Sequence, residues 1–129
     1  MKMRTLLMAG SVVVATLMPA LAQADADWKR GRVYYRMVCT QCHTEKAGGA
    51  ISPSVKTKAE WVAYFQADKH AKGKDSVKYY FSGKFRDSIK ATNKAAAKFS
   101  DVPEDELAAD VKEFLQKGAK DGDAPARCS

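Results

Sequence analysis

The sequence is poor in residues that bind metal ions, with three cysteines and two histidines among 129 residues. A second C-x-x-C pair is absent. A structural zinc site needs four ligands, and the single run Cys39–His43 supplies three at most. Internal repeats and low-complexity tracts are also absent, and no segment alternates polar and apolar residues as a half-exposed strand does. We therefore expect one small all-α domain rather than a zinc-binding or β-rich protein.

The N-terminal segment has no apolar run long enough to span a membrane comfortably. It contains Lys2 and Arg4, then an apolar run from Leu6 to Leu21, and it ends in an A-x-A pattern at Ala24. A basic, an apolar and a small-residue region in this order are typical of a signal peptide. We predict cleavage after Ala24, which makes 1–24 a signal peptide and places the protein in the periplasm without an integral membrane segment. The residue directly after the cleavage point is Asp25 and not a cysteine, so lipid anchoring there is not expected.

The run Cys39-Thr40-Gln41-Cys42-His43 has the C-x-x-C-H pattern of covalent c-type haem attachment. Two thiols on one turn of chain can both add to the vinyl groups of one porphyrin, and the adjacent imidazole can then reach the iron. A redox-active disulfide is the other interpretation, but the histidine directly after it in an exported chain favours haem. We predict one covalent haem c held by Cys39 and Cys42, with His43 as the proximal iron ligand.

Residues on both sides of this motif resemble the class I cytochromes c. The segment 31–39 is similar to the opening helix of that family, with Gly31 and Tyr35 where the family has a glycine and an aromatic residue. The segment 101–118 is similar to the closing helix, which crosses the first at the glycine. The resemblance implies an all-α bundle of three to five helices around one covalent haem. It also implies a proline carbonyl that accepts the hydrogen bond of the proximal imidazole; Pro53 is the candidate, and the alternative is that Pro53 only forms a turn.

Apolar periodicity and end signals predict the helices. They are expected at 25–38, at 57–69, as a short helix within 75–83, at 85–97 and at 101–118. A T-x-x-E capping box opens the second helix at Thr57, and Asp101 with Glu104 opens the last. We expect the haem domain to occupy 25–118 and a polar, mobile tail to follow at 119–129.

Methionine is scarce after the predicted signal peptide. Met37 is the only one, and it lies two residues before Cys39, too close to reach the other face of the porphyrin. The sequence thus departs from the class I pattern, in which a downstream methionine completes the iron coordination. The remaining histidine, His70, lies 27 residues after His43 and is the predicted distal ligand. An open or water-bound iron is the alternative, and Cys128 or a lysine are minor candidates.

Charge is unevenly distributed along the chain, whose formal net charge is +7. Residues 69–98 contain nine basic and two acidic side chains, whereas residues 99–129 contain four basic and eight acidic ones. A basic surface beside a haem would steer the protein to redox partners with an acidic docking surface, although it could equally serve solubility alone. Nucleic acid is not an expected partner in this compartment. With Cys39 and Cys42 used for haem, Cys128 has no internal cysteine partner, so it could link two chains into a dimer, bind another thiol or remain a free thiol.

These features together predict a periplasmic monohaem c-type cytochrome that carries single electrons between redox proteins. Two histidine ligands would give it a lower reduction potential than a histidine–methionine pair. The alternative function is a ligand-binding or gas-sensing haem protein with an open sixth coordination position. An enzyme of the peroxidase type is not expected, because a distal acid–base pair has no further histidine to use.

Overall fold

A computed structural model of the chain describes residues 25–41, 51–70 and 75–123. The regular elements of these residues are all helical, which confirms the predicted all-α class. They are α1 (Trp28–Met37), η1 (Cys39–Gln41), η3 (Pro53–Val55), α2 (Lys58–Ala67), η4 (Lys78–Phe81), α3 (Gly83–Ile89), α4 (Lys94–Ala97) and α5 (Glu104–Lys117), where η denotes a 3-10 helix. The predicted helix at 25–38 is α1, and Asp27 caps it by accepting hydrogen bonds from the N–H groups of Lys29 and Arg30.

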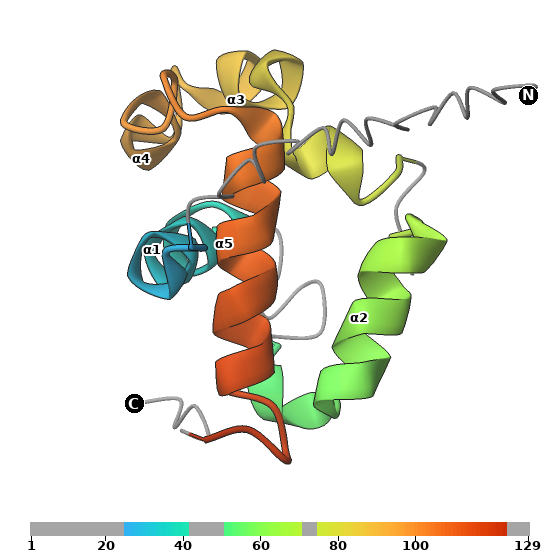
Figure 1. Cartoon of the computed structure of the whole chain (residues 1–129). Coiled ribbons are helices and arrows are strands. Elements are labelled where there is room, and N and C mark those ends of the chain that lie inside the picture. Colours follow the sequence, from blue (N-terminus) through green and yellow to red (C-terminus); the bar gives the residue numbers. More distant parts are fainter. Residues whose placement is uncertain (1–24, 42–50, 71–74, 124–129) are drawn as a thin grey trace, which may run out of the picture.

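Helix α5 is the element around which the others pack. Figure 1 shows α1 on one side of α5 and α2 on the other, with α3 and α4 beyond the N-terminal end of α5. Contacts with α5 come from α1 above all, and also from α2, η3 and η4. Helix α1, which precedes Cys39, helix α2, which precedes His70, and η3, which begins at Pro53, are therefore all held against one central helix.

The crossing of α1 and α5 is close because Gly31 has no side chain. A Cβ atom at this position would lie 2.1 Å from the backbone oxygen of Asp110, so only glycine fits. The role implied for Gly31 by the family resemblance is thereby confirmed. The Asp110 side chain, which is 1% exposed, accepts a hydrogen bond from the Asp27 N–H at 2.7 Å and forms an ion pair with Arg30. Backbone contact and ion pair together fix the two helices at one point.

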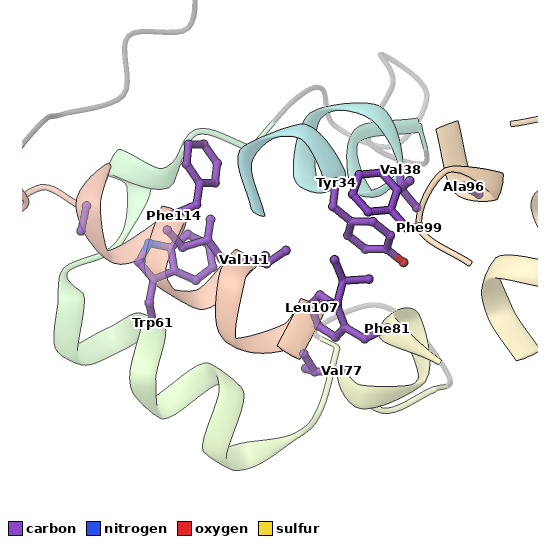
Figure 2. Packing of buried hydrophobic residues seen from close by; sticks show 12 residues of the cluster. Tyr34, Val38, Trp61, Val77, Phe81, Ala96, Phe99, Leu107, Val111 and Phe114 are labelled. Atoms are coloured by element: carbon purple, nitrogen blue, oxygen red, sulfur yellow. The ribbon is translucent and has the colours of Figure 1, made fainter. Parts of the chain in front are cut away.

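The hydrophobic core lies between α1, α2 and α5 (Figure 2). The apolar stripe predicted for the last helix is confirmed, since Leu107, Val111, Phe114 and Leu115 are all buried. Tyr34 of α1 is fully buried and packs edge-on against Phe99 with 5.0 Å between the ring centroids. Each such buried side chain contributes about 1.5–3 kcal/mol relative to full exposure.

The capping box of α2 is present as predicted. The Thr57 hydroxyl accepts a hydrogen bond from the Glu60 N–H at 3.2 Å, and the Glu60 carboxylate accepts one from the Thr57 N–H at 2.7 Å. The helix ends at Ala67, two residues before the predicted end, because Asp68 takes a left-handed conformation with φ of 52°. The chain therefore leaves α2 in a defined direction just before His70.

The helix predicted at 85–97 is two helices in the structure, α3 and α4. Buried Asn93 separates them, because its side-chain oxygen accepts hydrogen bonds from the N–H groups of Ala95 and Ala96 and so starts a new helix. Its side-chain amide also donates to the Met37 carbonyl oxygen at 2.9 Å. The break at Asn93 thus anchors α4 to the end of α1.

The predicted cap of the last helix is wrong in its details. Pro103 occupies the N-cap position of α5, and Asp101 is exposed and makes no capping bond. Glu104 is the first helical residue, and its carboxylate accepts a hydrogen bond from the Gly83 N–H at 2.8 Å. The acidic side chain connects α5 to α3 instead of closing a capping box.

Packing continues beyond Gly118, where the domain was expected to end. Ala119 is fully buried, and the Lys120 N–H donates to the Lys56 carbonyl oxygen at 3.1 Å. The Lys58 N–H donates to the Asp121 carboxylate at 2.8 Å, at the first residue of α2. Residues 119–121 therefore belong to the packed body, and residues 124–129 lie outside the described residues.

Candidate functional site

Cys39, the first of the two cysteines predicted to bind haem, lies just after the C-cap of α1. Cys39 begins the 3-10 turn η1, is half-buried and packs against the hydrophobic core. The Thr40 hydroxyl donates a hydrogen bond to the Arg36 carbonyl oxygen, which holds this turn against the end of the helix. Cys42 and His43, the other two predicted attachment residues, lie outside the described residues. Of the two thiols predicted to attach haem, the structure thus describes only that of Cys39.

His70 lies just after α2, where the chain turns towards η4. Asp68 fixes this turn, since its side chain accepts a hydrogen bond from the Lys78 N–H at 2.9 Å. The imidazole of His70 is half-buried and its Nδ1 atom is shielded from solvent. Its ring centroid lies 4.9 Å from that of Tyr80 and 6.4 Å from that of Tyr64. The two tyrosine rings hold the imidazole between α2 and η4.

Tyr64 lies beside His70 and packs against the same hydrophobic core as Cys39. The pKa of Tyr64 is raised to about 12, chiefly by burial and in addition by the charges of Cys39 and Tyr80. The aromatic rings around His70 therefore continue into the core against which Cys39 packs.

Tyr34 connects this region to the core. Its pKa is raised, chiefly by burial and in addition by the charge of Cys39. The Tyr34 hydroxyl donates a hydrogen bond of 2.5 Å to the Tyr80 carbonyl oxygen, which ties η4 to α1. Sequence reasoning missed Tyr34 and Tyr80 as site residues. A signal for Tyr34 was present, because it lies one helical turn after Gly31 and must share the face that meets α5.

Pro53 is buried at the start of η3. Its carbonyl oxygen accepts a hydrogen bond of 2.8 Å from the indole Nε1–H of Trp61 in α2. A carbonyl oxygen has two lone pairs, so this bond leaves one site for a second donor. Trp61 is itself 4% exposed and therefore serves the core. His43, the donor predicted for Pro53, lies outside the described residues.

Met37 faces away from this region. Its side chain is 49% exposed on the outward face of α1. Within the described ranges, no three side chains among His, Cys, Asp and Glu come together as a site for a metal ion. An aromatic lining with one thiol and one imidazole fits a flat apolar porphyrin better than it fits a bare ion. The residues present thus fit the haem predicted from the motif.

Comparison with known proteins gives one match. A family model described as Cytochrome c matches residues 28–119, which is most of the chain and runs from the first residue of α1 to just past α5. The chain matches no curated protein and no solved structure. Among the helices of the described residues, none combines the length and the apolar character that crossing a bilayer requires.

Proposed function

Because the chain belongs to the cytochrome c family, we propose that it is a periplasmic carrier of single electrons whose haem iron has two histidine ligands. The family binds covalently attached haem c and passes electrons between redox proteins. When bound, the haem supplies the one-electron couple of ferric and ferrous iron. Beyond these general properties of the family, our proposal for this chain specifies the two iron ligands, the location and a charged surface.

In this proposal Cys39 and Cys42 form the thioethers, and His43 is the proximal ligand, as the C-x-x-C-H motif requires. Pro53 orients the proximal imidazole by accepting its Nδ1–H with the lone pair that Trp61 leaves open. A fixed ring orientation and a defined hydrogen bond set the basicity of the ligand. Pro53 is therefore a positioning residue in this proposal.

His70 is the proposed distal ligand. The observation that carries this proposal is that the half-buried imidazole of His70 lies between the rings of Tyr64 and Tyr80, which pack towards the core that Cys39 also contacts. Rings of Tyr64 and Tyr80 restrict the imidazole, so little side-chain freedom remains to be lost on binding iron. Met37, which faces outward from α1, is badly located for the same task.

The location is proposed from the sequence. Residues 1–24 have the order of regions typical of a signal peptide, and haem attachment through C-x-x-C-H is expected outside the cytoplasm. The charge pattern supports acidic redox partners, because seven of the nine basic residues between 69 and 98 lie in described parts of the chain and six of these are exposed. Such a surface raises the rate of encounter with an acidic protein.

Ligand identity is tested by spectroscopy of the purified haem protein. His70→Ala should convert a six-coordinate low-spin iron into a high-spin form that binds carbon monoxide rapidly when reduced, as seen in visible and ferric EPR spectra. Lys69→Ala, an exposed neighbour, is the matched control and should leave both spectra unchanged.

An unchanged low-spin spectrum in His70→Ala would exclude His70 as the ligand. A wild-type protein that is already five-coordinate and binds carbon monoxide rapidly would instead favour the ligand-binding function. The same spectra therefore separate electron carriage from gas binding.

A further inference from the structure

Residues 51–58, the Pro53 segment, lead into α2, and hydrogen bonds from three other parts of the chain hold their backbone. The hydroxyl of Tyr35 in α1 donates to the Ile51 carbonyl oxygen at 2.6 Å. The indole Nε1–H of Trp61 in α2 donates to the Pro53 carbonyl oxygen at 2.8 Å. The third part is the chain directly after α5, and Figure 1 shows the end of α5 beside η3 and the start of α2. The Pro53 segment is therefore restrained along its whole length.

The Tyr35 hydroxyl belongs to a side chain whose ring already packs against the hydrophobic core. The centroid of this ring lies 5.6 Å from that of Phe114, so α1 and α5 together fix its direction. The hydroxyl is not needed for this packing, because the ring alone makes the contact. What the hydroxyl contributes is the bond to the Ile51 carbonyl oxygen, two residues before Pro53.

The chain after α5 forms a tight turn that holds the other end of the Pro53 segment. The Lys120 N–H donates to the Lys56 carbonyl oxygen at 3.1 Å. The Asp121 carboxylate accepts a hydrogen bond from the Lys58 N–H at 2.8 Å. Gly122 packs so closely in this turn that a Cβ atom would lie 2.2 Å from a backbone oxygen of α5. The turn therefore has a defined position, from which Asp121 reaches the first residue of α2.

Pro53 lies between these two connections and is itself restrained. It is buried, and its ring restricts the backbone angle φ. Ser52 caps η3, because its hydroxyl oxygen accepts a hydrogen bond from the Ser54 N–H at 3.3 Å. In so short and firmly held a segment, a displacement at either end is transmitted to the Pro53 carbonyl oxygen. Hydrogen bonds to this oxygen then weaken steeply, because donor and acceptor lose their alignment.

We propose that Tyr35 and Asp121 are positioning residues for the proximal haem ligand. They hold the two ends of the Pro53 segment and so fix the carbonyl oxygen that accepts the His43 Nδ1–H. This inference rests on the proposed function, in which Pro53 has that role. A hydrogen bond at Nδ1 raises the basicity of a metal-bound imidazole, and a more basic ligand favours ferric over ferrous iron. A less firmly held carbonyl should therefore raise the reduction potential.

The bond between Trp61 and Pro53 gives a first readout that does not involve the iron. Tyr35→Phe and Asp121→Ala should each accelerate solvent exchange of the Trp61 indole N–H at least about threefold, because the acceptor is held less firmly. The exchange is measured by NMR on the haem protein. The indole N–H of Trp28 is the internal reference in the same spectra, and its exchange should not change.

The reduction potential is the second readout, and a purely structural role would not change it. In Tyr35→Phe and in Asp121→Ala, the ratio of reduced to oxidised protein at a fixed applied potential should rise at least about threefold, or about 28 mV for a one-electron couple. Asp121→Asn has the same charge as Asp121→Ala but keeps an oxygen that can accept the Lys58 N–H. It should therefore change both readouts less than Asp121→Ala does.

Two further variants are matched controls. Tyr79→Phe removes a hydroxyl that forms no hydrogen bond within the described part of the chain. Asp123→Ala removes an exposed carboxylate two residues after Asp121, and this carboxylate forms no ion pair with another described residue. Both variants should have the indole exchange and the reduction potential of the wild type.

Reduction potentials that are the same in the Tyr35 and Asp121 variants as in the wild type would overturn the inference, even if the indole exchange changes. An effect of Asp121→Ala that Asp123→Ala reproduces would assign it to charge alone and would overturn the role of Asp121.

Exchange of the His43 Nδ1–H separates this inference from the proposed function. A protected proton whose exchange is equal in all variants would overturn the inference and leave the proposed function intact. A proton that exchanges as fast in the wild type as in free imidazole would show that Pro53 is not its acceptor. In that case the proposed role of Pro53 fails, and the inference fails with it.

Discussion

Gly31 determines how closely α1 and α5 approach each other, because it has no side chain. Gly31→Ala would place a methyl group against the Asp110 backbone, and helix α5 would have to shift. Overpacking of this kind costs typically about 1–3 kcal/mol, and the helix-forming preference of alanine returns at most about 1 kcal/mol. We expect the free energy of unfolding, measured with urea on the haem protein, to fall by about 2 kcal/mol.

Gly83→Ala is the matched control for this change. A Cβ atom at Gly83 would meet nothing closer than the Glu104 carboxylate at 3.8 Å, which is an ordinary contact. The stability of this variant should equal that of the wild type or exceed it slightly. A loss in Gly83→Ala as large as that in Gly31→Ala would mean that the close crossing is not what makes glycine necessary.

Ionisation of Tyr64 should lower the free energy of unfolding at alkaline pH. Its pKa in the folded protein is about 12, raised mainly by burial above the ordinary value of 10. A raised pKa favours the folded state fully below pH 10, and this contribution is lost as the pH rises through 12. If Cys39 forms the proposed thioether, its sulfur carries no charge, and burial remains the main cause of the raised pKa of Tyr64.

Comparison with Tyr64→Phe isolates this contribution. The stability difference between wild type and Tyr64→Phe, from urea unfolding, should change by about 1 kcal/mol to the disadvantage of the wild type between pH 10 and 12. One pKa unit corresponds to about 1.4 kcal/mol, and solvent screening of a hydroxyl that is only partly buried reduces the effect of the full shift. A difference that stays constant over this range would show that Tyr64 titrates normally.

At the scale of elements, Asp110 joins α1 to α5 through two different donors. One carboxylate oxygen accepts the Asp27 N–H and the other accepts the Arg30 guanidinium. In Asp110→Asn one side-chain oxygen remains as an acceptor. The other position becomes an NH₂ group, which is a donor and faces either the Asp27 N–H or the Arg30 guanidinium. Hydrogen bonds to charged groups contribute about 1.5–3 kcal/mol, so we expect a loss of that size in the free energy of unfolding.

Asp105→Asn is the control for charge alone, because Asp105 is exposed in the first turn of the same helix. It should cost less than about 1 kcal/mol, as expected from a weakened interaction with the helix dipole. Similar losses in both variants would mean that the net charge of α5 matters and the connection to α1 does not.

Long elements with strong periodicity were predictable from the sequence, and so was the short helix within 75–83, which is η4, but the division of 85–97 into two helices was not. The apolar stripe of α5 and the capping box of α2 are local patterns, so they specify their helices almost independently of context. The separation of α3 from α4 depends on Asn93, whose side chain binds the distant Met37 as well as its own helix. No local pattern reveals such a bond across more than fifty residues.

The site was predictable in part for the same reason. The C-x-x-C-H motif lies within five consecutive residues, so haem attachment can be predicted from it without knowledge of the fold. That His70 lies beside Tyr64 and Tyr80, and that Tyr34 holds the Tyr80 carbonyl, depends on how three separate elements pack. Sequence reasoning could nominate His70 only by eliminating the other ligands, whereas its aromatic surroundings required the fold.

On the scale of the whole molecule, the aromatic region needs the haem to complete it. A chain with Cys39→Ser and Cys42→Ser cannot attach the porphyrin covalently. A ligand that binds only the folded state stabilises it, and a domain of this size has little stability to spare. We expect far-UV circular dichroism of this variant to show a large loss of helix at room temperature. A native helical spectrum with a cooperative thermal transition would show that the polypeptide folds without its cofactor.

The contact between Gly31 and Asp110 joins residues from opposite ends of the folded chain. During synthesis α5 emerges last, so α1 must wait for almost the entire chain before its partner exists. If the chain is exported N-terminus first, as we propose, α5 also crosses the membrane last, and the contact between α1 and α5 forms only afterwards. Until then the turn at Cys39 stays open to haem attachment outside the cytoplasm.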